Sequence, residues 1–297
     1  MLERSILFGA NNGLVGTITR PAEPAVESDV GFLLFNAGVI HRVGPHRINV
    51  RLARELADRG VSSIRFDLAG HGDSARPSGD HSFEDQAVLD IQSAMDTLGA
   101  TANLRRFAIF GFCSGAYYGF AAAMADERVA GIMMFDAYRY PTVKTALLHY
   151  WSRLRQPRAL NGMIGAVGGI LAQFWRRAAR APAGDGQPRP TPAIGRIDFI
   201  PPKELFAAGL RTLLDRGVKI HMIYSGEAKR EYNYAGQFHD SVGALGIGSR
   251  IHADFFPDVN HAATGLADQA GLRAKVVEWG CALRVTTPDH LGVRRPL

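Results

Sequence analysis

A candidate nucleophile lies in residues 107–116, which read FAIFGFCSGA. An apolar run that ends in a glycine and continues into small residues is typical of a strand, a tight turn and a helix. A nucleophile in such a turn needs very small residues two positions before and after it, so that strand and helix can approach each other. Cys113 has glycines at both positions, whereas Ser114 has the bulky Phe112 two positions before it. We therefore expect Cys113, rather than Ser114, to be the nucleophile.

Composition indicates a globular chain in a reducing compartment. The chain has 297 residues, 46% of them hydrophobic and 21% charged, which suits one domain with an insertion or two small domains. The two cysteines, Cys113 and Cys281, predict no disulfide framework and favour a cytoplasmic location. We identify no secretory signal, and no apolar stretch reaches the roughly 18 residues that a membrane span requires.

Apolar patterning predicts alternating strands and helices. Asn11-Asn12-Gly13 lies between two weakly alternating runs and predicts a hairpin over residues 4–20. Buried strands are expected at 30–35, 61–66, 129–135, 220–225 and 250–256, and in the run before Cys113. Helices are expected at 48–59, 82–98 and 203–215, and a closing helix runs through Leu272 and Leu283. This alternation favours an α/β fold with a mainly parallel sheet and helices on both faces.

Residues 137–202 interrupt the alternation. Helical patterns at about 145–155 and 161–179 precede a loop rich in proline and glycine at 181–192. We therefore divide the chain into a core of residues 1–136 and 203–297 and a helical insertion of residues 137–202. Residues 139–189 contain nine basic side chains and one acidic side chain, a net charge of +8, whereas the whole chain carries +6.

Three motifs together resemble the α/β-hydrolase superfamily over essentially the whole chain. They are the turn around Cys113, the run GHGDS at 70–74 that follows Asp67, and a histidine, His261, just past the last expected strand. More narrowly, the chain resembles the hydrolases found beside exosortase and exopolysaccharide systems. Those proteins have a loop similar to RVGPHR at 42–47 and a Gly-x-Cys-x-Gly turn. The narrower resemblance does not select a substrate.

The resemblance implies a triad in the chain order nucleophile, acid, histidine. It implies that His261 is the base. The superfamily usually has an aspartate a few residues past the glycine that ends the strand at 220–225, and this region has none. Glu227 lies nearest to the strand end and is our choice of acid, with Glu231 and Asp136 as alternatives. A Cys–His pair depends less on the acid than a Ser–His pair, because a thiol is more acidic than a hydroxyl.

The resemblance also implies an oxyanion hole and a lid. One oxyanion donor is the backbone N–H of Ser114, and the other comes from the loop after the first parallel strand, where Gly38 is the first choice and Val39 the next. An insertion at this place forms a lid over the nucleophile. We expect the basic and aromatic side chains of that lid to contact substrate, with Trp175, Arg176 and Arg177 as candidates.

These features predict a Cys-dependent esterase or thioesterase with an acyl-Cys113 intermediate, resolved by water or by an acceptor hydroxyl or amine. The expected substrate is a small-molecule or carrier-linked acyl compound. An apolar inner face with a basic rim suits an acyl chain on an anionic carrier such as coenzyme A, an acyl carrier protein or a charged glycan. No cofactor or metal ion is expected. No nucleic-acid partner is expected either, since no nucleic-acid motif is present. The alternative is a non-catalytic binding protein of the same fold that docks an acidic partner through its basic lid, and the missing aspartate is its best support.

Overall fold

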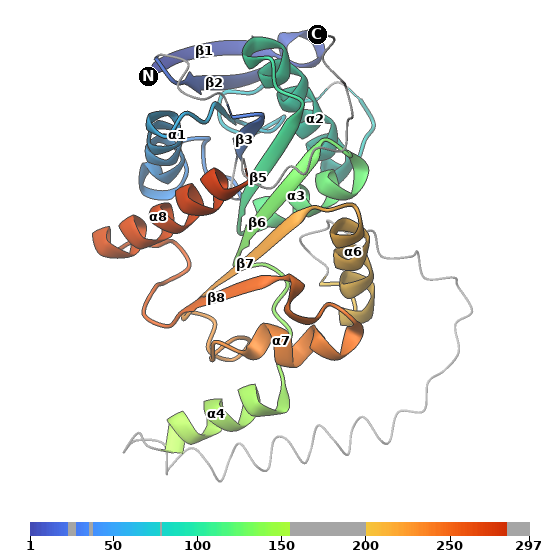
Figure 1. Ribbon diagram of the computed structural model, residues 1–297, viewed down its shortest axis with the longest axis vertical. Coiled ribbons are helices and arrows are strands. Elements are labelled where there is room, and N and C mark those ends of the chain that lie inside the picture. The colour runs from blue at the N-terminus through green and yellow to red at the C-terminus, as the bar shows by residue number, and fades with distance from the viewer. Residues whose placement is uncertain (23–27, 36–37, 78, 155–199, 284–297) are drawn as a thin grey trace, which may run out of the picture.

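The computed structural model describes residues 1–22, 28–35, 38–77, 79–154 and 200–283. These residues form an eight-stranded sheet in the order β1-β2-β4-β3-β5-β6-β7-β8 (Figure 1). The first two strands, β1 (Leu2–Phe8) and β2 (Leu14–Arg20), form the predicted hairpin, and β2 pairs antiparallel with β4. All other neighbouring strands pair in parallel. The prediction of a mainly parallel sheet in an α/β fold is therefore confirmed.

The parallel strands bring the ends of six segments to one edge of the sheet. Their bounds are Val30–Phe35 for β3, Ser63–Phe66 for β4, Arg106–Phe112 for β5, Val129–Phe135 for β6, Lys219–Ser225 for β7 and His252–Phe256 for β8. Side chains along β3, β4 and the middle of β5 and β6 are buried, as a parallel sheet covered on both faces requires. Loops that follow these strands therefore lie beside one another.

Helices cover both faces of the sheet, each face with its own hydrophobic core (Figure 1). One face carries α1 (Ile48–Asp58) and α8 (Leu266–Ala282), and the other carries α2 (Phe83–Ala102), α3 (Ser114–Ala125) and α6 (Lys203–Asp215). The Ser82 hydroxyl accepts a hydrogen bond from Asp85 N at the start of α2 and so caps that helix. Shorter elements are α7 (Gln237–Val242) and the 3₁₀ turns Ala10–Asn12, Pro45–Arg47, Gly243–Leu245 and Gly248–Arg250.

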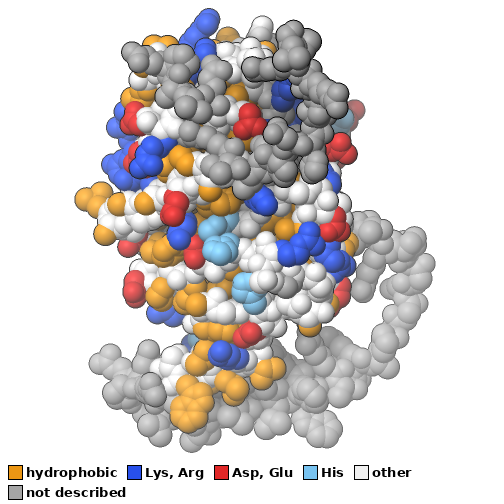
Figure 2. Space-filling model, in the orientation of Figure 1, with side chains coloured by type: hydrophobic (Ala, Val, Ile, Leu, Met, Phe, Trp, Pro, Cys, Tyr) orange, Lys and Arg blue, Asp and Glu red, His pale blue; other side chains and the backbone are white. Residues whose placement is uncertain are grey.

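The insertion is described only at its two ends, residues 137–154 and 200–202. Its first helix, α4 (Val143–Leu154), stands beyond the sheet at the end where β8 lies (Figure 1). Exposed hydrophobic side chains gather over α4 at the lower end of the face in Figure 2; they include Val143, Leu147, Leu148, Tyr150 and Trp151. The expected helix at 161–179 and the loop at 181–192 lie outside the described residues, so the lid remains a prediction. Among the described residues, no helix is long and apolar enough to cross a membrane.

Candidate active site

Cys113 occupies the turn between β5 and α3. Its backbone has φ 54° and ψ −122°, a strained conformation for a residue with a side chain, and Ser114 is already the first residue of the helix. Cys113 N donates to Phe135 O on the neighbouring strand at 3.0 Å, which holds the turn against the sheet. The structure thus places the thiol, and not the Ser114 hydroxyl, at the point of the turn.

Gly111 shows why this turn needs a glycine two positions before the nucleophile. A Cβ at position 111 would lie 2.4 Å from Ala116 Cα and 2.8 Å from Ala116 N, closer than non-bonded atoms approach. Only a residue without a side chain lets β5 and α3 meet at this distance. The steric argument made from the sequence therefore has its counterpart in the packing of the turn.

His261 lies next to Cys113 in the loop that follows β8. Its side chain forms a hydrogen bond with the Cys113 thiol, and its ring packs near Phe112 and Phe135, with ring centroids 6.0 and 6.2 Å away. About a third of the side chain, 35%, remains exposed to solvent. A histidine held between a thiol and aromatic rings, yet open to solvent, can exchange protons with a substrate or with water.

Asp136 contacts the same imidazole. His261 Nδ1 lies 2.7 Å from Asp136 Oδ2, and the carboxylate is fully buried. Ser225 holds the carboxylate from the end of β7, because its N–H donates to Oδ1 at 2.7 Å and its hydroxyl to Oδ2 at 2.6 Å. Asp136 directly follows β6, and its φ of 56° turns the chain at this point. Cys113, His261 and Asp136 therefore form one hydrogen-bonded chain.

The structure does not place Glu227 against the imidazole, as our choice of it as the acid requires. Its carboxylate accepts a hydrogen bond from the backbone N–H of His261 and not from the imidazole. Glu231, one of the alternatives, pairs with Arg139 at 2.8 Å. The physical reason is the strand order: β6 lies between β5 and β7, so the short Asp136 side chain at its end reaches the imidazole, while Glu227 lies against the backbone of the histidine loop.

The contacts of the thiol and the imidazole shift their pKa values in opposite directions. Burial alone would raise the pKa of Cys113, but the hydrogen bond and charge of His261 and the Ser114 N–H outweigh burial and lower it. The hydrogen bonds to Asp136 and Cys113 exceed the cost of burial and raise the pKa of His261 to about 10. A lowered pKa of the thiol and a raised pKa of the imidazole favour a thiolate–imidazolium pair at neutral pH.

Two backbone N–H groups lie where an oxyanion hole is expected. Ser114 N–H contacts the Cys113 sulfur, and Gly38, with φ +56°, follows β3 on the adjacent loop. Gly38 N donates to the Ser114 hydroxyl at 2.5 Å, so the Ser114 side chain occupies the Gly38 donor in this structure. The side-chain contact was not predicted. Val39, the second choice, is 86% exposed.

Three predicted site residues lie outside the described part of the chain, and one contact of the site was not predicted. The proposed lid contacts Trp175, Arg176 and Arg177 lie outside the described residues. Ser225, which fixes Asp136, was not singled out from the sequence. A polar residue at the very end of a buried strand, at the same sheet edge as the nucleophile, is the signal that both Asp136 and Ser225 carry.

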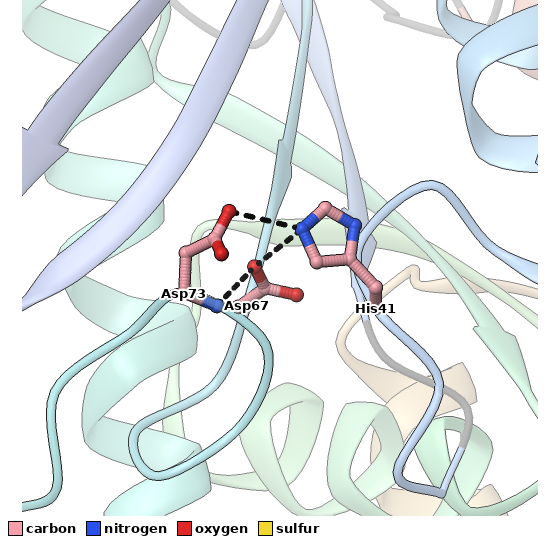
Figure 3. Close-up of side chains that lie close together, drawn as sticks. All are labelled: His41, Asp67 and Asp73. Atoms are coloured by element: carbon pink, nitrogen blue, oxygen red, sulfur yellow. Dashed lines mark hydrogen bonds and ion pairs between the residues drawn. The ribbon is translucent and has the colours of Figure 1, made fainter.

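The described residues also hold one group of side chains with metal-ligating atoms. His41, Asp67 and Asp73 each place one such atom within 4.8 Å of the others (Figure 3). Arg42 Nη1 lies among them, 2.5 Å from Asp67 Oδ2, 2.7 Å from Asp73 Oδ2 and 2.7 Å from His41 Nε2. The guanidinium thus supplies the positive charge that the two carboxylates require.

Solved structures of low sequence identity share this fold. A lidless α/β serine hydrolase from Xanthomonas campestris is 14% identical with a TM-score of 0.54, and the match covers 97% of this chain and 96% of that one. An α/β serine hydrolase homologue from Coxiella burnetii is 15% identical, with a TM-score of 0.55 and coverage of 94% and 97%. A meta-cleavage product hydrolase from Pseudomonas fluorescens IP01 is 19% identical, with a TM-score of 0.53 and coverage of 93% and 97%.

Family comparison agrees with the fold. No curated protein matches the chain significantly. The alpha/beta hydrolase family matches residues 40–278, which include Cys113, Asp136 and His261. The chain therefore belongs to the alpha/beta hydrolase family.

Proposed function

We propose that the protein is a cysteine-dependent acyl hydrolase that cleaves an ester or thioester through an acyl-Cys113 intermediate. The observation that carries this proposal is the hydrogen-bonded chain from the Cys113 thiol through His261 to the buried carboxylate of Asp136. Membership of a hydrolase family gives the general reaction class, and the thiol at the turn gives the intermediate its chemistry.

The first half of the reaction transfers the acyl group to sulfur. The Cys113 thiolate attacks the substrate carbonyl, a C–S bond forms, and the carbonyl oxygen becomes an oxyanion next to Ser114 N–H and Gly38 N–H. Gly38 N–H must then exchange the Ser114 hydroxyl for the oxyanion. When the tetrahedral intermediate collapses, the bond to the alcohol or thiol breaks, and the His261 imidazolium donates its proton to that leaving group.

The second half releases the acyl group. His261, now neutral, takes a proton from water, and the resulting hydroxide attacks the thioester carbon. Breakage of the C–S bond gives a carboxylic acid and restores the thiolate and the imidazolium. An acceptor hydroxyl or amine in place of water turns the same sequence into acyl transfer. Asp136 keeps the imidazole in the tautomer that serves both halves.

The same proposal extends to an anionic acyl carrier. The basic side chains of residues 139–189 would attract coenzyme A, an acyl carrier protein or a charged glycan. The narrower resemblance to hydrolases beside exosortase systems belongs to this proposal and does not choose among these carriers. The non-catalytic alternative drew its support from the lack of an aspartate after β7, and the contact of Asp136 with His261 takes that support away.

Intact-mass spectrometry tests the proposal directly. The protein is incubated with p-nitrophenyl esters and acyl thioesters, and the mass gain of one acyl group is monitored. The parent protein and Cys281→Ala should gain one acyl group, whereas Cys113→Ala should gain none. Acylation of Cys113→Ala that is lost in Ser114→Ala would assign the nucleophile to Ser114. No acylation of the parent protein by any substrate would favour a binding protein.

A further inference from the structure

We propose that Arg42 and Asp67 are positioning residues that hold the Gly38 N–H in the oxyanion hole. Neither residue touches the reacting thiol; both act through the loop that carries Gly38. The inference rests on the proposed acylation of Cys113 and adds to it a charge pair between the loop after β3 and the end of β4.

Asp67 ties two loops together from a fully buried position at the end of β4. Its Oδ1 accepts Arg42 N at 2.6 Å, and its Oδ2 accepts Arg42 Nη1 at 2.5 Å and Asp73 N at 3.2 Å. Arg42 belongs to the loop after β3 and Asp73 to the loop after β4. Figure 3 shows the Asp73 carboxylate facing His41, which also lies in the loop after β3. One carboxylate therefore fixes the backbone of both loops.

Gly72 shows how closely the second loop surrounds this carboxylate. Its φ is +51°, and a Cβ there would lie 2.4 Å from the carboxylate carbon of Asp67. The hydroxyl of Ser74 donates to Asp67 O at 2.7 Å and accepts from Val15 N at 2.9 Å. The Asp67 carboxylate is thus closely packed by the loop after β4. It has little room to move with the loop after β3 if that loop shifts.

The loop that carries Gly38 is held at both ends. The buried amide of Asn49 donates to Phe35 O at 3.3 Å, where β3 ends, and to Arg42 O at 3.2 Å. Gly38 lies three residues after Phe35 and four before Arg42. Because Asn49 joins these two points and Asp67 fixes the second of them, the position of Gly38 N–H depends on the Arg42–Asp67 contact.

The charges make this contact strong. A carboxylate that is fully buried must be paired, because an isolated buried charge is very costly. The Arg42 side chain is 13% exposed and contacts both Asp67 and Asp73. It therefore supplies the positive charge that the buried Asp67 carboxylate requires. Replacing either Arg42 or Asp67 breaks this pair, and we expect the loop after β3 to shift in response.

Two reactions of the Cys113 thiol, alkylation and acylation, distinguish a displaced oxyanion donor from a change in the thiol itself. Alkylation of Cys113 by iodoacetamide displaces iodide at a saturated carbon and forms no oxyanion. Acylation by p-nitrophenyl acetate passes through an oxyanion. In Asp67→Asn, we expect the ratio of acylation rate to alkylation rate to fall at least tenfold, since removing one oxyanion donor costs about 10²–10³ in rate.

Arg42 variants and a distant ion pair provide the controls. Arg42→Met should lower the same ratio and provides an independent test if Asp67→Asn does not fold. Arg42→Lys should lower the ratio less than Arg42→Met, because the positive charge remains. The control is Asp126→Asn, which breaks an ion pair with the more exposed Arg128 (2.8 Å) beyond the end of α3 and should leave the ratio unchanged.

The outcomes are distinct. An unchanged ratio in both the Asp67 and the Arg42 variants would overturn the inference while the acyl-cysteine mechanism stands. An equal fall of both rates would also overturn it, because the defect would then lie in the thiol or the fold. Absence of acylation in the parent protein would overturn the proposed function and this inference with it.

Discussion

At the scale of single residues, a thiol at the turn changes what the neighbouring imidazole must do. A serine hydroxyl needs a base to remove its proton during attack, whereas a thiolate is already formed if the imidazole holds the proton. The contacts of His261 with Asp136 and Cys113 favour that charged state. The pair is therefore expected to persist between the lowered pKa of the thiol and the raised pKa of His261.

The pH dependence of alkylation tests this charge state. In Cys281→Ala, where only Cys113 remains, the rate of reaction with iodoacetamide should rise with pH around a pKa below the roughly 8.5 of a free cysteine. His261→Asn should move that pKa above the free value, because the burial of the thiol is then no longer opposed by the imidazolium. Equal pKa values in the two proteins would contradict the ion pair.

Asp136 and Glu227 can be distinguished by paired amide substitutions. Asp136→Asn should lower kcat for an ester at least tenfold, since the tautomer of His261 is no longer fixed. It should also move the alkaline limb of the pH profile to lower pH, because the Asp136 hydrogen bond contributes most to the raised pKa of His261. Glu227→Gln should cost less than about fivefold, since the amide oxygen still accepts the His261 backbone N–H. The reverse order of effects would restore Glu227 as the acid.

At the scale of elements, boundaries followed from where buried apolar runs meet polar residues. The strands β3 and β6 end at the residues expected from sequence, and α6 has the expected bounds. The six-residue α7 was not predicted, because it is too short for a helical period to appear. The contact of Asp136 with His261 did not follow from the sequence because it depends on strand order. Asp136 is 125 residues from His261 in sequence, and only the adjacency of β5, β6 and β7 brings them together.

A close crossing of two loops determines where His261 lies. Gly226 N donates to Val259 O at 3.0 Å, and a Cβ at position 226 would lie 1.8 Å from Pro257 O. Gly226→Ala must therefore push the loop after β8 away, and overpacking of this kind costs about 1–3 kcal/mol. We expect lower thermal stability together with a loss of acylation, since the moved loop carries the base.

Gly271→Ala is the matched control for this substitution. Gly271 lies within α8 with no atom near its Cβ position, so alanine should be neutral or should stabilise the helix by up to about 1 kcal/mol. The measurements are the melting temperature and the rate of Cys113 acylation in each variant. A Gly226→Ala protein that retains the parent's stability and activity would show that the crossing tolerates displacement.

At the scale of the whole molecule, chemistry gathers at one edge of the sheet. The thiol, the acid, the histidine loop and the loop with Gly38 all follow the carboxyl ends of parallel strands, as open α/β sheets require. Figure 2 shows histidine side chains in the middle of one face with charged side chains around them. The insertion begins directly after Asp136 at this same edge. Its basic residues therefore begin close to Asp136 in the chain.

Reversing two charges of the insertion tests whether it receives an anionic carrier. Arg176→Glu with Arg177→Glu should raise KM for a carrier-linked thioester and leave kcat largely intact, because long-range attraction acts on encounter and not on the chemical step. Added salt should weaken the parent's preference for that substrate, since exposed charges more than about 10 Å apart are screened at 0.1 M ionic strength.

A small neutral ester provides the comparison within each protein, and the outer hairpin provides the comparison between proteins. Arg4→Glu with Arg20→Glu makes the same change of charge on exposed residues of β1 and β2, at the opposite end of the sheet from β8. The ratio of KM in the variant to KM in the parent should rise for the carrier-linked substrate only, and only for the insertion variant. If both substrates give equal ratios, the basic side chains form a solvated surface; if both variants give the same rise, net charge alone attracts the carrier. In either case Cys113 retains its proposed mechanism, because the neutral ester reaches it without the insertion's charges.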